Sequence, residues 1–168
     1  MTIRRARRED QPHVVGIIRS SASWYRPFVA AEDLGEHEVD EAWARENFAR
    51  REFFVGHVDG AVVATVTLQD AGDFSYLGYV YVHAEHTGKG LGRDLLDFAR
   101  DESRDRGDKG MVLIAHPEAD WACKTYERYG FDVIAEREDK ILAWNNGFLR
   151  PYYEKGFQLY RYLHVRAS

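Results

Sequence analysis

A change of periodicity around three closely spaced glycines constrains the fold of this chain more than any other feature. Residues 76–83 are rich in tyrosine and valine, as is typical of a β-strand. Gly88, Gly90 and Gly92 follow this run. The next segment has apolar residues at helical spacing, at Leu91, Leu95, Phe98 and Ala99. The sequence therefore predicts a strand, a glycine loop and a helix in succession, which is a unit of an α/β fold.

A second feature predicts a β-hairpin. Two β-rich runs, residues 53–58 and 61–68, are joined by the dipeptide Asp59-Gly60. An Asp-Gly pair between two such runs is among the strongest short-range signals for a tight two-residue turn. We expect the two runs to pair as antiparallel strands.

The remaining segments extend this arrangement to the whole chain. Further strands are expected at 2–6, 111–115, 131–134 and 157–163, and further helices from Pro12 onward, over 39–50 and over 120–129. The inward side chains expected for the first two helices are Val14, Ile17 and Ile18, and Val39, Ala42, Trp43 and Phe48. A loop is expected from Trp24 to Gly35. The order β-α-α-β-β-β-α-β-α-β-β predicts a mixed sheet with helices on its faces. At 168 residues the chain suits one domain, residues 1–168.

Composition limits the function classes. The net charge of −5 gives no basic field for nucleic acid. No apolar run is long enough to span a membrane, and no signal peptide is visible at the N-terminus. The single cysteine, Cys123, excludes an internal disulfide and a cysteine-rich metal site. We expect a soluble cytoplasmic protein that binds neither nucleic acid nor a membrane.

The glycine loop itself has two interpretations. Glycines between a strand and a helix let successive backbone N–H groups face an anion, and Lys89 and Arg93 add positive charge beside them. The loop could also be a tight connection without a ligand. Its spacing is neither that of a P-loop nor that of the dinucleotide fingerprint.

Two motifs carry a resemblance to a known family. Residues 81–96 resemble the acetyl-CoA signature of the GNAT acetyltransferases, Arg/Gln-x-x-Gly-x-Gly/Ala at a strand–helix junction. Farther along, Ala122-x-x-x-Tyr126-Glu127-x-x-Gly130-Phe131 resembles the second family signature, a helix ending in Tyr-Glu-x-x-Gly-Phe. The resemblance covers nearly the whole chain, more loosely at 20–50 and 140–156. It implies a GNAT-type mixed, splayed β-sheet flanked by helices, and an N-acetyltransferase that uses acetyl-CoA.

The same resemblance implies roles for particular residues. The backbone of Val80, Tyr81 and Val82 would pair with the pantetheine arm of acetyl-CoA. Tyr126 would stand near the thioester sulfur, where its phenol, protonated at neutral pH, suits a proton donor to the departing thiolate. The pyrophosphate would be held by the N–H groups of Gly88, Lys89, Gly90, Leu91, Gly92 and Arg93.

The sequence departs from the family pattern at two positions. Thr87 stands where the first motif has Arg or Gln, and Ala119 stands where an asparagine often opens the second. Both could weaken CoA binding. Together with the lack of an obvious glutamate base, they leave open a non-catalytic acyl-CoA-binding module or structural partner protein.

The general base has several candidates. The strand at 111–115 carries no carboxylate. The candidates are His116 or Glu118 at its end, or a water relayed by Tyr79 or Tyr81. His83 and His86 are expected on the surface, and Cys123 is interpreted as a packing residue rather than an acyl carrier.

The resemblance implies that the acceptor is a primary amine on a small molecule or a peptide. An acidic segment would favour a cationic amine, although such runs are usually solvated; its residues are Glu32, Asp33, Glu36, Glu38, Asp40 and Glu41. Aromatic residues could line the acceptor pocket or bury a homodimer surface; these are Trp24, Tyr25, Phe28, Trp144, Phe148, Tyr152 and Tyr153.

Overall fold

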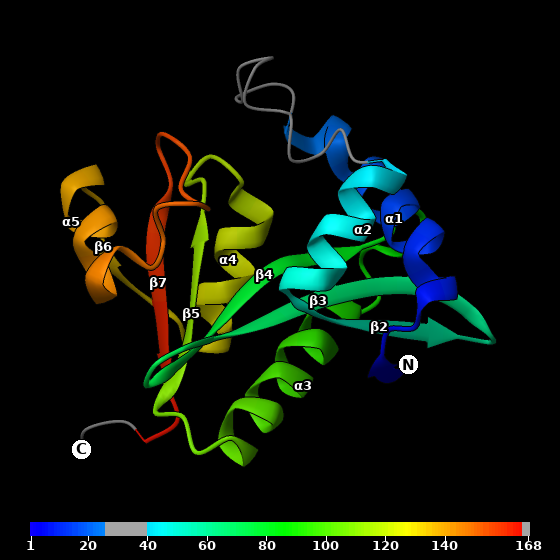
Figure 1. The fold of residues 1–168 in the computed structure, drawn as a ribbon, viewed down its shortest axis with the longest axis horizontal. Coiled ribbons are helices and arrows are strands. Elements are labelled where there is room, and N and C mark those ends of the chain that lie inside the picture. Colours follow the sequence, from blue (N-terminus) through cyan, green and yellow to red (C-terminus); the bar gives the residue numbers. More distant parts are fainter. Residues whose placement is uncertain (26–39, 166–168) are drawn as a thin grey trace. The chain divides into compact units, whose positions relative to one another are not determined.

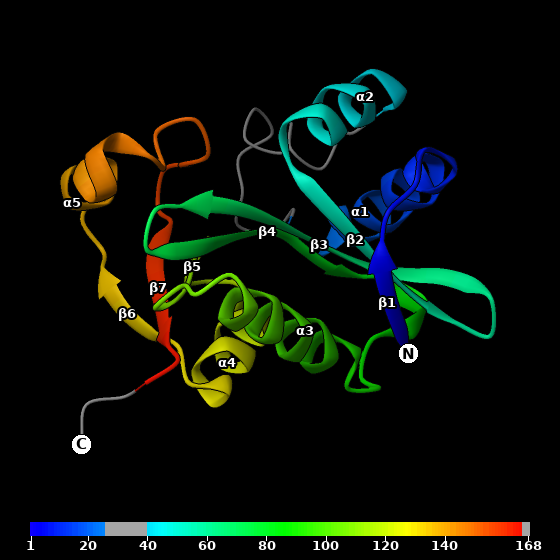
Figure 2. The same cartoon turned by 60° about the horizontal axis from the view of Figure 1, so that its bottom comes forward.

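The computed structural model describes residues 1–25 and 40–165, with the side chains of 22–25 left out. Within it the strands form a mixed seven-stranded sheet in the order β1-β2-β3-β4-β5-β7-β6 (Figure 1). The strands are β1 (Thr2–Arg5), β2 (Glu52–Val58), β3 (Ala61–Ala71), β4 (Phe74–Val82), β5 (Gly110–Ala115), β6 (Asp132–Ala135) and β7 (Gln158–Leu163). The α-helices are α1 (Gln11–Tyr25), α2 (Glu41–Arg50), α3 (Leu91–Asp105), α4 (Asp120–Tyr129) and α5 (Glu138–Ala143) (Figure 2).

The chain divides into two compact units. The first unit consists of Met1–Leu68 and Tyr79–Phe98, and the second of Gln69–Gly78 and Ala99–Ser168. The predicted order of strands and helices is confirmed, with α5 as an addition that the sequence analysis did not anticipate. No helix within residues 1–25 and 40–165 has the length and apolar character needed to cross a membrane.

The predicted hairpin joins β2 and β3. Asp59 has φ 50° and Gly60 has φ 82°, so both central residues of the turn are left-handed. This conformation matches the twist of the flanking strands, and glycine adopts it without a steric penalty. The two strands pair antiparallel, with Val58 opposite Ala61.

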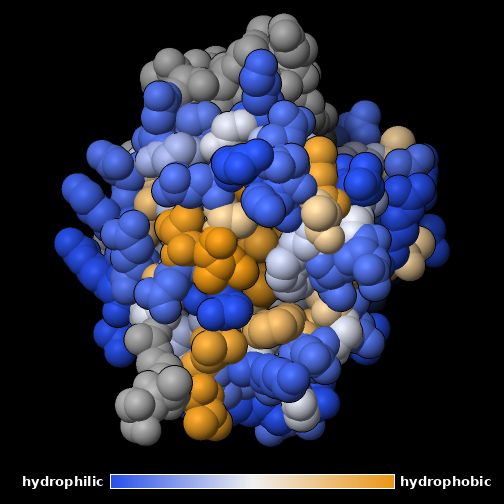
Figure 3. Space-filling view, turned by 90° about the vertical axis from the view of Figure 1, so that its left-hand side faces the viewer, coloured by the Kyte–Doolittle hydropathy of each residue, from blue (hydrophilic) through white to orange (hydrophobic). Residues whose placement is uncertain are grey.

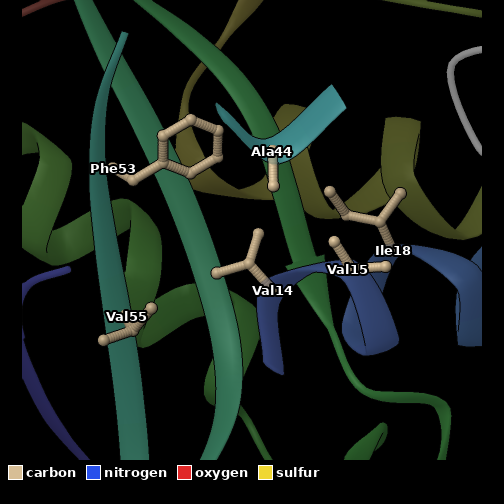
Figure 4. Close-up of a cluster of buried hydrophobic side chains, with 6 residues drawn as sticks. All are labelled: Val14, Val15, Ile18, Ala44, Phe53 and Val55. Carbon is tan, nitrogen blue, oxygen red and sulfur yellow. The ribbon is translucent and has the colours of Figure 1, made fainter. Parts of the chain in front are cut away.

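The core of the first unit lies where α1 and α2 contact the sheet. Val14, Ile17 and Ile18 are fully buried, as the helical spacing predicted. Figure 4 shows six side chains of this core, which come from α1, α2 and β2. They are Val14, Val15, Ile18, Ala44, Phe53 and Val55.

The second helix differs from its prediction in its start and in one inward residue. Asp40 is the N-cap of α2, and its Oδ1 accepts a hydrogen bond from the Trp43 N–H at 2.9 Å. A capping carboxylate satisfies one of the free N–H groups of the first turn, so the helix starts at Glu41. Trp43 and Phe48 pack against the core, as expected. Ala42 is exposed and Ala44 is buried instead, which corrects the expectation for Ala42. Val39 lies outside the described residues. The loop expected from Trp24 is wrong at its start, because α1 continues to Tyr25.

The second unit has its own core, between the sheet and the segment that includes α5. Tyr76, Val112, Ile141, Leu149 and Leu159 are buried together. Aromatic residues of the segment before β7 pack partly buried against them; they include Trp144, Phe148, Tyr152 and Tyr153. These four side chains are therefore core contacts of the second unit.

Gly110 is the first residue of β5, and it pairs with a neighbouring strand on each side. It lies opposite Phe74 in the parallel ladder with β4 and opposite Leu163 in the antiparallel ladder with β7. A Cβ atom at this position would overlap the carbonyl oxygen of Tyr162. The close approach of β7 therefore requires glycine here.

Candidate active site

The segment between β4 and the glycine loop is fixed by local hydrogen bonds. The His83 N–H donates to the Val63 carbonyl at 2.8 Å, which continues the pairing with β3 past the end of β4. A short 3-10 turn, Ala84–His86, follows. The Thr87 hydroxyl donates to the Ala84 carbonyl at 3.1 Å. Thr87 therefore closes this turn, and it lacks the charge of the arginine that the family pattern allows at this position.

The glycine loop leads into α3 with left-handed backbone at two positions. Gly88 and Gly90 both have φ 79°. The first described helical bond of α3 runs from the Asp94 N–H to the Gly90 carbonyl at 3.2 Å. The N–H groups of Leu91, Gly92 and Arg93 precede it, and helix geometry leaves such groups without an acceptor inside the helix.

Gly92 is the most informative residue of this loop. Its φ is not in the left-handed region, and a Cβ built on it would meet no described atom within 4 Å beyond its chain neighbours and the backbone of its own helix. Neither backbone conformation nor packing within the described residues therefore requires a glycine here. The exposed cations of Lys89 and Arg93 lie beside it in the sequence. The loop thus offers backbone donors, positive charge and open space, which fits the phosphates of a nucleotide cofactor.

The last residues of β4 carry two tyrosines on one side of the strand. The ring centroids of Tyr79 and Tyr81 are 6.3 Å apart, and both rings pack against the core of the first unit. Residues two apart on a strand point to the same face, which agrees with this arrangement. Val80 and Val82 are half-buried. Tyr79 has φ 44°, which is rare for a bulky side chain.

Tyr126 belongs to the second unit, near the C-terminal end of α4. Gly130, with φ 120°, caps this helix, and its N–H donates to the Tyr126 carbonyl at 3.1 Å. The half-buried Tyr126 ring lies 5.9 Å from the rings of both Phe131 and Tyr160. The second motif therefore forms the predicted helix end, and Tyr126 is held there by aromatic packing.

Cys123 lies on the same helix and is only 6% exposed. Burial raises the pKa of its thiol, and the Sγ donates to the His116 carbonyl at 3.3 Å. Burial, together with a hydrogen bond to Cys123, also raises the pKa of the Tyr160 hydroxyl. A protonated, buried thiol is a poor nucleophile. This supports the interpretation of Cys123 as a packing residue.

The candidate bases are not equally suited to proton abstraction. The Nδ1 atom of His116 accepts a hydrogen bond from the Glu118 N–H at 3.1 Å. This bond places the ring hydrogen of a neutral His116 on Nε2, so neither nitrogen has a lone pair ready for a substrate proton. Glu118 is exposed. His83 likewise uses Nδ1 to accept from the Glu85 N–H, at 3.2 Å.

Ala119 occupies the N-cap position of α4 and is 1% exposed. It makes no side-chain cap, so the polar contact that an asparagine could provide is replaced by a buried methyl group. The acidic residues Glu32, Asp33, Glu36 and Glu38 lie outside the described residues, as do Phe28 and the side chains of Trp24 and Tyr25.

The sequence analysis did not single out Arg51, which contacts the end of β4. Its guanidinium carbon lies 4.5 Å from the centroid of the Tyr79 ring. Arg51 stands between a predicted helix and a predicted strand, where nothing in the sequence indicates which ring it meets. The contact depends on pairing between segments far apart in the chain.

Comparison with known proteins agrees with the two motifs. Residues 17–131, more than half of the chain, match the sequence model of the acetyltransferase (GNAT) family. The chain is 29% identical over 142 residues to the L-amino acid N-acyltransferase MnaT of Escherichia coli K12, which covers 81% of this chain and 82% of MnaT.

Solved structures share the fold. The PaiA N-acetyltransferase of Thermoplasma acidophilum, in complex with coenzyme A, superposes with a TM-score of 0.70 at 18% identity, covering 98% of this chain and 100% of PaiA. YncA of Salmonella typhimurium, solved with its cofactor acetyl-CoA, has a TM-score of 0.64 at 23% identity, covering 100% and 96%. The GNAT-type fold is therefore confirmed, and the chain is an acyltransferase that belongs to the acetyltransferase (GNAT) family.

Proposed function

We propose that this chain transfers the acetyl group of acetyl-CoA directly to the primary amine of a small-molecule acceptor, within a ternary complex. The observation that carries the proposal is Gly92. A glycine inside a helix costs roughly 0.5–1 kcal/mol relative to alanine, and the described residues give no reason for it. A ligand that approaches the backbone at this point would supply the reason.

Acetyl-CoA fits this place. Its pyrophosphate would accept hydrogen bonds from the N–H groups around Gly90 and Gly92, with Lys89 and Arg93 neutralising part of its charge. The backbone of Val80, Tyr81 and Val82 would pair with the pantetheine arm, as a peptide adds to a strand. The bound CoA of PaiA and acetyl-CoA of YncA support this choice of cosubstrate.

The chemistry requires few protein groups. The neutral amine attacks the thioester carbonyl carbon, the C–N bond forms and the C–S bond breaks. Backbone N–H groups at the end of β4 would stabilise the developing oxyanion. Tyr126 would donate its hydroxyl proton to the departing thiolate sulfur. Because His116 uses Nδ1 within the chain, a water relayed by Tyr79 or Tyr81 is the base we favour.

A small-molecule acceptor is supported by the relative MnaT, which is named for transfer to L-amino acids. The test is thiol release from acetyl-CoA over a panel of amino acids, alkylamines, aminoglycosides and peptides, with CoA binding measured in parallel. We expect turnover with a small amine. CoA binding without turnover on any acceptor would instead support the non-catalytic acyl-CoA-binding module.

We also propose that the chain forms a homodimer. The density of aromatic residues from Phe148 to Tyr162 predicts that some of them are exposed and pair with another chain. The structure corrects the exposure, because these residues are buried or half-buried. Apolar surface nevertheless gathers on the face of the second unit that carries α5 and β6 (Figure 3). Val133, Ile134 and Ala135 of the edge strand β6 are only half-buried. A single-chain mass by sedimentation at micromolar concentration would contradict the dimer.

A further inference from the structure

A cation and a strained aromatic residue meet at the end of β4, directly before the residues proposed to bind acetyl-CoA. The Arg51 guanidinium lies over the Tyr79 ring at 4.5 Å, and Tyr79 has φ 44°. A bulky residue in this conformation costs free energy and persists only where its surroundings hold it. Such residues are concentrated at functional sites.

Aromatic rings hold Tyr79 in place. Trp43 of α2 meets it edge-on, with centroids 5.1 Å apart and ring planes at 86°. Phe53 of β2 and Tyr81 of β4 each lie 6.3 Å from it. The rings of Trp43, Phe53, Tyr79 and Tyr81, here called the aromatic cluster, belong to the first unit.

The backbone of Arg51 is held in place at the junction between α2 and β2. Its N–H donates to the Asn47 carbonyl at 2.8 Å and closes the last turn of α2, and β2 starts at the next residue. The side chain is half-buried. A guanidinium carries five N–H donors in a planar fork that matches the two oxygens of a carboxylate. It has more donors than one acceptor uses, so it can bind a carboxylate beside any other partner.

We propose that Arg51 binds a carboxylate of the acceptor, which makes α-amino acids the substrate class. The proposal rests on the proposed function. In an α-amino acid the amino nitrogen is two bonds from the carboxylate carbon, so a carboxylate held at Arg51 keeps the amine near the end of β4. There the backbone of Val80–Val82 would hold the acyl donor. A second ammonium, as in a polyamine, would be repelled by the guanidinium.

The decisive experiment compares acceptors that differ only in this group. L-α-amino acids are each assayed beside their own carboxamide, with kcat/KM calculated on the concentration of neutral amine, because the two amines differ in basicity. The parent is compared with Arg51→Gln, with Arg51→Lys, and with Arg50→Gln as the matched control. Arg50 is the exposed neighbour at the end of α2. The KM for acetyl-CoA and the melting temperature are measured for each protein.

We expect the parent to prefer the acid over its carboxamide. Arg51→Gln should lower kcat/KM for the acid about 10- to 100-fold, as the loss of a charged hydrogen bond predicts, and leave the carboxamide and the KM for acetyl-CoA nearly unchanged. Arg51→Lys should keep part of the preference, since it keeps the charge but loses the planar fork. Arg50→Gln should behave as the parent.

Three results would overturn the inference. The parent could turn over carboxamides as well as acids, Arg51→Gln could reduce both substrates equally, or Arg50→Gln could abolish the preference as well. Each leaves the acetyltransferase proposal standing. The absence of turnover with every amine would contradict the proposed function and the inference with it. If Arg51→Gln does not fold, the inference is tested by the parent's preference for the acid over its carboxamide and by the change of this preference in Arg51→Lys.

Discussion

The guanidinium of Arg4 donates two hydrogen bonds to the carboxylate of Asp10. Nη1 donates to Oδ2 at 2.7 Å and Nη2 donates to Oδ1 at 3.0 Å. Oδ2 also accepts the Arg7 N–H at 2.7 Å, and Asp10 is 5% exposed. The pair joins β1 to the start of α1. The hydrogen bond from Arg4 holds the pKa of Asp10 below its usual range.

This pair makes stability depend on pH in the acidic range. The pKa of Asp10 is lower in the folded protein than in the unfolded chain. The contribution of Asp10 to the free energy of unfolding is therefore complete above the unfolded pKa of about 3.9, and it is lost as pH falls through the folded pKa. Asp10→Asn should destabilise the protein at neutral pH by roughly 1–3 kcal/mol, and the difference from the parent should shrink in acid. Urea unfolding at several pH values measures it. Asp139→Asn, in the exposed pair with Arg137, is the control and should cost less than about 1 kcal/mol.

His164 predicts a second, milder pH dependence. Its Nε2 lies 2.9 Å from the Ser103 hydroxyl, which itself donates to the Gly110 carbonyl. Ser103 therefore accepts from His164, and Nδ1 is buried with no hydrogen-bond partner among the described residues. Burial lowers the pKa of His164.

The unfolded chain thus binds this proton more readily than the folded protein. Stability should be complete above the ordinary histidine pKa of about 6.5 and should fall as pH drops toward the folded value. The decrease of the free energy of unfolding between about pH 7 and pH 5 should disappear in His164→Gln. The control His57→Gln, on β2, should keep this decrease. Denaturant midpoints between about pH 7 and pH 5 provide the measurement. If the free energy of unfolding of His164→Gln still decreases with falling pH as in the parent, the pH dependence comes from another group.

The proposed binding of the CoA phosphates by the glycine loop can be tested at Gly92, because its φ is not in the left-handed region. Gly92→Val places a side chain in the open space beside the proposed phosphates and should abolish CoA binding in calorimetry. Gly90→Val is a weaker test, because φ 79° strains any side chain at this position. Gly16→Val is the matched control, since Gly16 also lies in a helix with no atom within 4 Å of a Cβ. If Gly92→Val binds CoA as tightly as the parent, the assignment of the glycine loop as the phosphate-binding site is wrong.

Tyr126→Phe separates an acid from a packing residue. The variant keeps the ring contacts with Phe131 and Tyr160 and removes only the hydroxyl. If this hydroxyl protonates the thiolate, kcat should fall roughly 10²-fold while CoA affinity holds. The loss should be smaller for acyl donors with better leaving groups. Tyr129→Phe, on the same helix, is the control. A lower melting temperature with unchanged kcat would assign Tyr126 to packing alone.

Local sequence signals predicted the parts of the fold that depend on a few neighbouring residues. The turn at Asp59-Gly60 and the helix stop at Gly130 were predictable because left-handed backbone favours glycine there. The short helix α5 was not, because its six residues are too few to show helical periodicity.

The contact between Arg51 and Tyr79 illustrates what sequence reading cannot reach. Tyr79 carries no local signal for positive φ, and its conformation depends on rings contributed by α2 and β2. The glycine loop was recognisable because its chemistry depends on the backbone. The acceptor contact proposed at Arg51 depends on side chains that only tertiary packing brings together.

Gly110 limits how the gene for this protein can change. Every missense mutation of its codon adds at least a Cβ, which would overlap the Tyr162 carbonyl oxygen and push β7 from β5. No substitution at position 110 alone can therefore be neutral, and a second change that shifts β7 would have to come with it. Among natural variants of this chain, we expect position 110 to stay glycine, while the apolar residues around it can exchange for others of similar volume.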